Sequence, residues 1–388
     1  MPQPPGPSGR AFPVLPVILI GALFLFGVDT MFGQLSRNGY FELSEFVLAD
    51  GLSLPGSNRS ILRHYVGVPA VDNFMTTINV FWANVVDGSR PELSLFVFFF
   101  GSQLVAFFLV FMIESQRVAR WSPVLFNPLV WGFAMQALGY GIVAPVFFAL
   151  HLAVTSRLNL SDTVRLRDPT SLHTVVPAFL LGYVLLCCAL AYPFSHSHAR
   201  QWANAVWQTF PLHVLAWQAL FTGIVKRTSL GQDAFTAGAQ LDRAALSHAY
   251  GFAWNVAVTG QLCTAGVLLT SAVFPGLYPA GVARSLTLGS VFGPGLPHSS
   301  TPMVSPAAAI HEFFKYDLYV GSAVTLVWAV YLLSQVRPVL STSEERGNLA
   351  RGIMTSLILS GPGGAVVALL QHRDETVLAA ELKAEKSK

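Results

Sequence analysis

The residues from Leu93 to Ile113 form an apolar stretch without a single charge, and it ends at an acid, Glu114. A transmembrane α-helix needs about 20 predominantly apolar residues, so this stretch is long enough to cross a bilayer. Only 11% of the 388 residues are charged and the mean hydropathy is +0.54, whereas about 25% of a soluble domain is charged. The sequence therefore predicts an all-α, polytopic membrane protein folded as a helical bundle.

Eight apolar segments are long enough to be read as transmembrane helices. They lie at about residues 11–32, 93–113, 125–154, 175–194, 203–225, 249–274, 316–334 and 352–371. The first of them follows Arg10 and is predicted to be an uncleaved signal anchor. The segment Val71–Val86 is short and amphipathic. We predict a helix tucked against the bundle there, with a re-entrant helix, an interfacial helix or a ninth span as alternatives.

The chain is predicted to have one folded domain. Residues 1–10 are polar and rich in proline, which predicts a disordered N-terminus. Residues 11–372 are expected to form a single transmembrane bundle, because no loop is large enough for a separate domain. Residues 373–388 carry many charges and are expected to be a solvated tail.

Several function classes find no support in this sequence. The net charge of +3 is too small to indicate a nucleic-acid partner. Cys187, Cys188 and Cys263 lie in apolar segments without metal-ligand spacing, which is typical of packing residues. The sequence contains no DDxxD or DxDD run and no HExxH, GxSxG or P-loop motif. The sequence therefore offers no ligand set for the Mg-diphosphate chemistry of soluble prenyl enzymes.

Two glycosylation sequons begin at Asn58 and Asn159. In an eight-span arrangement both fall on the same side of the membrane, which predicts a glycoprotein with this side in a lumen. Lys and Arg nearly balance between alternate loops, so the positive-inside rule leaves the orientation open.

Polar residues within the apolar segments form patterns that simple packing does not require. Gln103 and Glu114 are eleven residues apart, which is about three helical turns, so they share a helix face. Gln136, Tyr140 and His151 lie close to one face of the next long segment. Ionisable groups within a membrane usually face the interior of the bundle or a cavity, so these positions are candidates for a buried site.

A dense polar and aromatic cluster, His311–Tyr319, opens the segment before the last. Glu312 and Asp317 are five residues apart and do not share a helix face, so only one is expected to point into the bundle. Asp317 lies deeper and is followed by Gly321, which permits close contact between helices. Lys315 is expected to extend its ammonium group toward the interface.

Each acid also has a purely structural interpretation. Glu114 can pair with Arg117 or Arg120 at the end of its helix, Asp317 can bond to a neighbouring helix, and Asp72 can cap the helix that follows it.

The other candidates have structural interpretations too. Glu312 can be a solvated interfacial group, and His151 a satisfied interior histidine. Trp207 and Tyr140 can belong to an aromatic belt.

Several stretches between about residues 65 and 335 resemble a family of fungal multi-span membrane terpene cyclases of meroterpenoid biosynthesis, which includes the ascochlorin and ascofuranone cyclases. The stretches are Val71-Asp72 with Asp87-Gly88, Phe111-Met112-Ile113-Glu114-Ser115-Gln116-Arg117, Gln136-Ala137-Leu138-Gly139-Tyr140-Gly141 with Pro145 and His151-Leu152, Trp207-Gln208-Thr209-Phe210-Pro211, and Tyr316-Asp317-Leu318-Tyr319-Val320-Gly321.

This resemblance implies a chemistry. A carboxylic acid in the membrane protonates the terminal epoxide or alkene of a farnesylated aromatic, and the carbocation then closes rings without metal or cofactor. Glu114 and Asp317 are the expected proton donor and its partner, with Asp72 third. Six further residues are expected to contact the substrate, by lining the cavity, by taking up the final proton or in other ways: Tyr140, Trp207, His151, Gln136, Glu312 and Gln103.

The resemblance also implies surroundings for the protein. It predicts a multi-pass protein of the endoplasmic reticulum membrane, in contact with lipid. The substrate would be a lipophilic farnesyl-phenol epoxide supplied by an epoxidase or monooxygenase.

Two other classes remain open from the residues alone. In a transporter of a lipophilic metabolite, the intramembrane acids would couple protons, although transporters often carry inverted repeats and none is found here. In a structural or assembly protein, the acids would join helices to one another.

Overall fold

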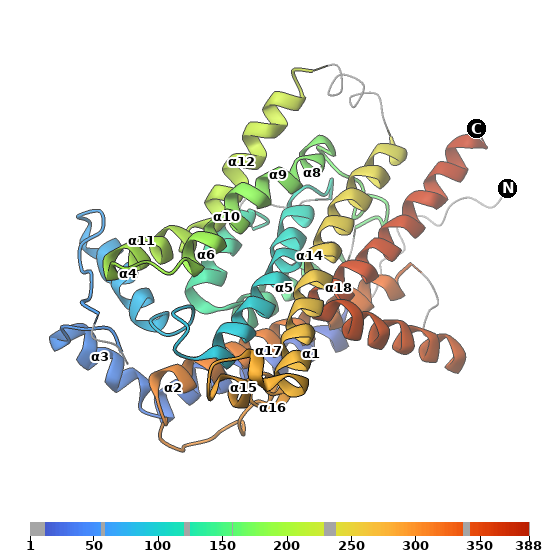
Figure 1. Ribbon diagram of the computed structural model, residues 1–388. Helices are drawn as coiled ribbons and strands as arrows, with labels where there is room; N and C mark the ends of the chain where they lie inside the picture. Colours follow the sequence, from blue (N-terminus) through green and yellow to red (C-terminus); the bar gives the residue numbers. More distant parts are fainter. Residues whose placement is uncertain are drawn as a thin grey trace.

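The computed structural model describes residues 12–55, 59–119, 125–156, 158–228, 238–336 and 342–387. Within these ranges the chain is helical and contains no strand, so the predicted all-α class is confirmed (Figure 1). The predicted disordered N-terminus, Asn58 of the first sequon and Arg120 lie outside the described residues.

Five helical segments are long and apolar enough to cross a membrane. The first comprises α1 (Val14–Val28), η1 (Asp29–Gly33) and α2 (Gln34–Arg37). The others are α5 (Pro91–Ser115), α14 (Ala239–Val273), α17 (Pro306–Ser334) and α18 (Ser343–Lys386). Shorter apolar helices occupy residues 128–138, 140–155, 175–191 and 210–225, so the count of eight spans stays a prediction.

Two of the predicted spans are broken in the structure. The segment predicted at residues 125–154 consists of α6 (Pro128–Leu138) and α7 (Tyr140–Thr155). Between them stands Gly139 with a φ of +87°, a conformation that residues with a side chain rarely adopt. The segment predicted at 203–225 is likewise divided, into α11 (Ser197–Gln208) and α12 (Phe210–Val225).

The C-terminal region departs from the predicted solvated tail. Helix α18 continues to Lys386, and Arg373, Asp374 and Leu378 are buried. The many charged residues after 372 predicted exposure to solvent. In the structure, however, Arg373 and Asp374 form hydrogen bonds to polar partners inside the protein. The tail prediction is therefore wrong for the first turns after residue 372.

The remaining helices are short and lie around the long ones. Helix α4 (Pro69–Phe81) is the helix predicted within Val71–Val86, and it packs against α3 (Tyr40–Asp50) and α11. The others are α8 (Thr170–His173), α9 (Val175–Phe179), η2 (Leu180–Val184), α10 (Leu185–Ala191), η4 (Pro275–Leu277), α15 (Val282–Ser285) and α16 (Leu288–Phe292).

Helix α5 is the centre of the arrangement, since every residue from Gln103 to Ser115 is buried. Helices α14, α17 and α18 pack against it (Figure 1), and α7 and α1 pack against α17 and against each other. An apolar helix buried on all sides is the expected interior element of such a bundle.

The contact between α7 and α17 depends on Gly321. A Cβ atom at this position would lie 2.3 Å from Cδ1 of Tyr140, far inside van der Waals contact. The prediction that Gly321 permits close helix approach is thereby confirmed, and the partner is the ring of Tyr140.

We expect Gly321→Ala to lower the free energy of unfolding by about 1–3 kcal/mol, the usual penalty of overpacking. Gly266→Ala on α14 is the matched control, because no atom lies within 4 Å of its built Cβ. Denaturant unfolding of both variants in detergent micelles measures the difference. Equal stability of the two variants would contradict this account of the contact.

Candidate functional site

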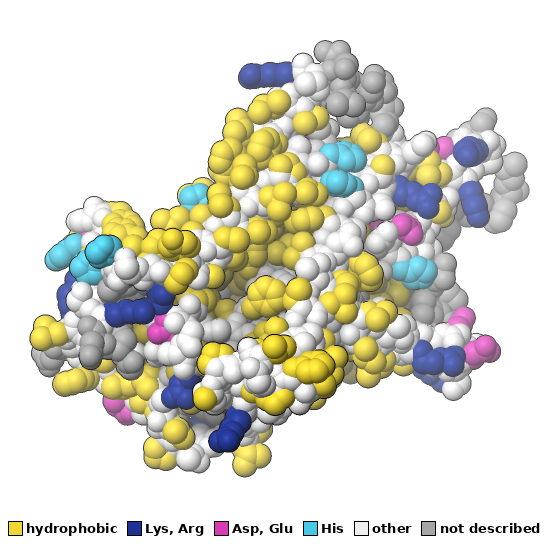
Figure 2. All heavy atoms as spheres, viewed as in Figure 1, with side chains coloured by type: hydrophobic (Ala, Val, Ile, Leu, Met, Phe, Trp, Pro, Cys, Tyr) yellow, Lys and Arg dark blue, Asp and Glu magenta, His cyan; other side chains and the backbone are white. Residues whose placement is uncertain are grey.

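The bundle contains a large, partly open apolar cavity of about 1170 Å³. Helices α4, α5, α10, α11, α14 and α17 contribute its walls, together with the ends of α6 and α7. Figure 2 shows hydrophobic side chains gathered around a hollow between α11 and α14. Its aromatic lining residues are Phe32, Tyr40, Phe41, Phe74, Phe81, Trp82, Phe98, Phe100, Tyr140, Tyr183, Trp207, Phe252, Phe313 and Phe314.

Asp317 is the only carboxylate among the lining residues in the described part of the chain, and no Lys or Arg accompanies it. Its side chain is buried on α17, and Oδ1 accepts the N–H of Gly141 at 2.6 Å. No basic side chain of the described ranges forms an ion pair with it. A buried carboxyl without a cation strongly disfavours ionisation, so this group is suited to carry a proton.

Two glycines bring the start of α7 against Asp317. A Cβ at Gly139 would lie 2.8 Å from Oδ1 of Asp317, and one at Gly141 would lie 3.0 Å from its carbonyl oxygen. The sequence Gly139-Tyr140-Gly141 therefore allows the backbone N–H of Gly141 to approach the carboxyl directly. The alternative that Asp317 bonds to a neighbouring helix is correct, and the same residue also faces the cavity.

Tyr140 lies in the cavity wall beside Asp317 and is held from two sides. Its ring stacks on Phe107 with 4.3 Å between the ring centroids, and its hydroxyl lies 2.6 Å from Oγ1 of Thr325. Both partners are buried, so the orientation of this ring is fixed by packing and hydrogen bonding together.

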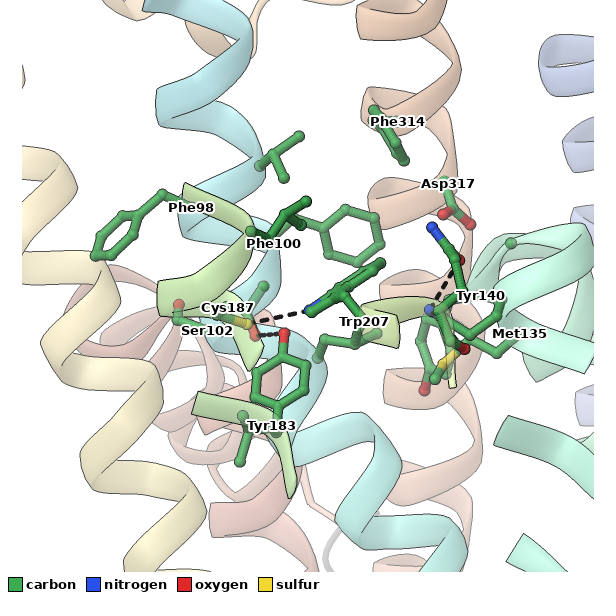
Figure 3. A pocket seen from close by; sticks show the side chains of 18 of the residues that line it. Phe98, Phe100, Ser102, Met135, Tyr140, Tyr183, Cys187, Trp207, Phe314 and Asp317 are labelled. Atoms are coloured by element: carbon green, nitrogen blue, oxygen red, sulfur yellow. Dashed lines mark hydrogen bonds between the residues drawn. The ribbon is translucent and has the colours of Figure 1, made fainter. Parts of the chain in front are cut away.

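Trp207 forms part of a continuous aromatic wall. Its N–H donates to Sγ of Cys187 (Figure 3), and its ring centroid lies 4.7 Å from that of Trp82. The Trp82 ring in turn contacts Phe314, one turn before Asp317 on α17. Sequence reasoning missed Trp82, because no pattern at the end of α4 distinguishes it from an interfacial tryptophan.

A chain of amides begins at the cavity. Gln136 and Gln208 both line it, and the Nε2 of Gln136 donates to Oε1 of Gln208 at 3.1 Å. Gln208 donates to Asn204, and Asn204 donates to Asn79 of α4. This buried chain ties α4, α6 and α11 together along one wall.

Glu114 does not line the cavity. Its Oε1 accepts Nε of Arg117 at 3.2 Å, and its Oε2 lies 2.9 Å from Nε2 of His151. All three side chains are buried. The structural interpretation, in which Glu114 pairs with Arg117, is therefore confirmed.

The hydrogen bonds assign the protonation of His151. The indole N–H of Trp328 can only donate, and it points to Nδ1 at 3.1 Å. Nδ1 is therefore an acceptor, and the ring proton resides on Nε2, which donates to Glu114. His151 is a satisfied interior histidine, as its alternative interpretation stated.

Arg117 extends this cluster to the C-terminal helix. Its Nη2 donates to Oδ2 of Asp374 at 2.6 Å, and its Nη1 donates to the carbonyl of Val164. The hydroxyl of Tyr250 donates to the same oxygen of Asp374. This ion-pair cluster thus joins α5, α7, α14, α17 and α18.

Asp72, the third predicted acid, holds a loop outside the cavity. Its carboxylate accepts the backbone N–H groups of Tyr65, Val66 and Gly67. These bonds, first that of Val66, lower the pKa of Asp72 below its ordinary value, against a smaller opposing effect of desolvation. Helix α4 begins at Pro69, before Asp72, so the carboxylate fastens the preceding chain instead of capping a helix that starts after it.

Glu312 and Lys315 also act outside the cavity. Oε2 of Glu312 accepts the N–H of Gly295 at 2.6 Å, and Nζ of Lys315 donates to Oε1 of Glu312 and to the carbonyl of Gly293. Lys315 is buried and does not reach the interface, because these two acceptors satisfy its charge inside the protein. The cluster at the start of α17 therefore fastens the segment that follows α16.

Gln103 stabilises a break in α18 instead of lining the cavity. Helix α18 is kinked at Gly361, whose φ is +69°, just before Pro362. Oε1 of Gln103 accepts the N–H of Gly363, and its Nε2 donates to the carbonyl of Ala257. A buried amide thus satisfies backbone groups near the kink.

Within the described ranges, no group of three or more His, Cys, Asp and Glu side chains is placed to hold a metal ion. The site consists of one carboxyl, a wall of aromatic rings and a few neutral polar groups. This arrangement can donate a proton and surround a positive charge.

Comparisons with known proteins relate this chain to fungal terpene cyclases. A family model described as "CtvD domain" matches residues 15–378. Terpene cyclase atmA of Aspergillus flavus is 27% identical over 359 residues, which cover 88% of this chain and 91% of the relative. Terpene cyclase ctvD of Aspergillus terreus is 24% identical, covering 91% and 97%. Terpene cyclase ascI of Acremonium egyptiacum is 25% identical, covering 92% and 91%. No solved structure matches the chain significantly.

We expect Glu114→Ala to reduce the free energy of unfolding by about 3–5 kcal/mol, because it leaves the buried Arg117 charge short of a partner. Asp168→Ala is the control, since its ion pair with Lys226 is partly exposed and worth at most about 1 kcal/mol. Unfolding in detergent compares the two. A Glu114→Ala variant as stable as Asp168→Ala would show that the ion-pair cluster does not stabilise the bundle.

The lowered pKa of Asp72 makes its contribution to stability dependent on pH. The contribution is complete above the unfolded pKa of about 3.9 and is lost as the pH falls through the lower folded pKa. The difference in melting temperature between the wild type and Asp72→Asn should therefore shrink between about pH 5 and about pH 2. A difference that stays constant over this range would rule out the ionised carboxylate as the loop anchor.

Proposed function

Because this chain belongs to the CtvD-domain family, whose model matches residues 15–378, we propose that it is a membrane-embedded terpene cyclase of meroterpenoid biosynthesis. The observation that carries the proposal is Asp317, which provides the one carboxyl group that the described residues place in the wall of a large aromatic cavity. Its substrate is a lipophilic prenylated aromatic, and its product is a cyclised isomer. The curated relatives, which bear the name terpene cyclase, support this class of reaction.

In this mechanism Asp317 donates the first proton. Burial without a cation favours its neutral form, so the group enters the reaction with a proton to give. The N–H of Gly141, 2.6 Å from Oδ1, stabilises the carboxylate that remains after the transfer. The same group can take up the final proton, so the enzyme returns to its starting state.

The reaction then proceeds along the prenyl chain of the substrate. The proton binds the oxygen of a terminal epoxide, the C–O bond breaks, and a carbocation forms; with an alkene, the proton binds carbon directly. Successive double bonds attack the cation and close rings. Loss of a proton, or capture by an internal oxygen followed by loss of its proton, ends the reaction, so that the product is an isomer of the substrate.

The cavity wall protects and stabilises this cation. Aromatic faces contribute about 0.5–2 kcal/mol each to a nearby positive charge, and Trp82, Trp207 and Phe314 form a continuous set of rings next to Asp317. The apolar lining also excludes water, which would quench the cation early. Tyr140 and Gln136 complete the wall around the acid.

We assign the donor role to Asp317 and structural roles to Glu114 and Asp72. Glu114 is paired with Arg117 and His151 away from the cavity, and Asp72 anchors a loop. An acid with a cationic partner is a poor proton donor, because the partner stabilises the ionised form.

The surroundings proposed for the enzyme follow from its family and substrate. We place it in the endoplasmic reticulum membrane, where an oily substrate can enter from the lipid. An epoxide substrate requires an epoxidase or monooxygenase earlier in the pathway.

We expect Asp317→Asn to reduce turnover by at least about 100-fold, the lower bound for loss of general acid catalysis. Microsomes containing the chain are incubated with a synthetic farnesyl-phenol terminal epoxide and, in parallel, with its epoxide-free analogue. The product has the mass of the substrate and a different retention time. Glu312→Gln, outside the cavity, is the control and should retain turnover.

Unfolding of Asp317→Asn in detergent distinguishes loss of chemistry from loss of fold. A folded Asp317→Asn variant with the turnover of the wild type would refute Asp317 as the donor. Recovery of both substrates unchanged from wild-type microsomes, with transport of either across the membrane, would favour the proton-coupled transporter.

A further inference from the structure

Helix α14 carries a row of polar residues along the cavity. The residues of this row that line the cavity are Ser247, His248, Asn255 and Thr259. Asn255 follows Ser247 by eight residues and His248 by seven, and Thr259 follows Asn255 by four, so all four lie on one helix face. Gly251 lies between them on the same face and also lines the cavity. The row extends over about 18 Å, since a helix rises 1.5 Å per residue.

Three members of this row make no side-chain hydrogen bond within the described parts of the chain, and the ring of one of them, His248, packs beside that of His173 with 5.7 Å between the centroids. Within the described parts of the chain, Ser247, His248 and Asn255 make no side-chain hydrogen bond or ion pair to another residue, whereas Thr259 bonds to the carbonyl of Asn255. Elsewhere around the cavity the amides are satisfied, as in the pair of Gln136 and Gln208. All three side chains line the cavity and are exposed, so their hydrogen-bonding groups are accessible to a ligand there.

The row and Asp317 lie on opposite walls. Helix α14 packs against α5 and α18, and α17 packs against α7, α18 and α1. In Figure 3, α14 runs along the left side in pale yellow, and Asp317 projects from α17 on the right, with Trp207 between them. A ligand that reaches both walls therefore crosses the aromatic part of the cavity.

We propose that Ser247, His248 and Asn255 bind the oxygen-bearing aromatic head of the substrate, so that its prenyl chain crosses the cavity and presents its end to Asp317. The proposal rests on the cyclase function proposed above and adds the direction in which the substrate lies. A prenylated aromatic has hydrogen-bonding groups only at its head when its terminus is an alkene. The polar row therefore selects the head, and the aromatic wall receives the chain.

Photolabelling tests this orientation without depending on turnover. Microsomes with the wild type and with Asp317→Asn are irradiated with a farnesyl phenol that carries a diazirine on the aromatic ring, or at the prenyl terminus. Labelled peptides are identified by mass spectrometry, with competition by unlabelled farnesyl phenol. We expect the ring probe to label residues 247–259 and the terminal probe to label residues 313–321.

Three outcomes would each overturn the proposal. The two probes could label the opposite peptides, both probes could label the same peptides, or unlabelled farnesyl phenol could fail to reduce the labelling. Expected labelling together with absence of any cyclised product in the wild type would instead refute the cyclase function and leave the orientation standing. The two failures are therefore distinguishable.

A kinetic measurement tests the proposed contact between Asn255 and the aromatic head of the substrate. Asn255→Leu should raise the KM for farnesyl phenol epoxide about 2- to 10-fold, as expected for loss of one hydrogen bond. It should leave the KM for the analogue without the phenolic oxygen unchanged. Gln261→Leu is the matched control, because this amide lies on α14 outside the cavity and bonds to the carbonyl of Ile358. Equal effects of Asn255→Leu on both substrates would contradict recognition of the head.

Discussion

The cost of placing a carboxyl group in an apolar bundle governs this structure, and the chain meets it in two ways. Glu114 is ionised among partners: Arg117 and His151 contact its two oxygens, and Arg117 continues to Asp374. Asp317 has no cationic partner among the residues that the structure describes, and it accepts a backbone N–H from Gly141. Charge compensation suits a group that stabilises the fold, whereas isolation suits a group that must carry a proton. The same chemical group, a carboxyl, thereby serves two different purposes within one bundle.

The isolation of Asp317 depends on the backbone around it. Gly139 ends α6 with a positive φ, and Gly141 lets α7 begin directly against α17. Gly321, one turn after the acid, receives the ring of Tyr140. Because each contact would be blocked by a Cβ atom, these glycines determine how closely the carboxyl, the phenol ring and the cavity wall can lie together. The break in the predicted span at 125–154 is thus part of the site.

The cavity wall is held by elements that are not long spans. Helix α4 supplies Phe74 and Phe81, and the residue after it, Trp82, continues the aromatic wall. Asn79 of this helix receives the end of the amide chain that begins at Gln136, and Asp72 fastens the loop before it. These polar contacts position the aromatic rings against which a cation would lie. Asp72, a predicted catalytic residue, therefore serves the site indirectly, by holding the loop before α4.

The sequence alone determined the class of the fold and the short set of residues worth considering. Apolar stretches such as 93–113 can only be stable as buried helices in lipid, and the acids within them stand out because such groups are rare there. The spacing of Asp317 and Gly321 predicted a close helix contact, which depends only on local geometry. The tertiary structure alone decided which acid faces the cavity. Arg117 and Asp374 are 257 residues apart, and no local pattern reveals such a pairing. It also decided where helices break and that Arg373, Asp374 and Leu378 are buried, because hydropathy averages over a window and records neither a positive φ nor a partner from a distant helix.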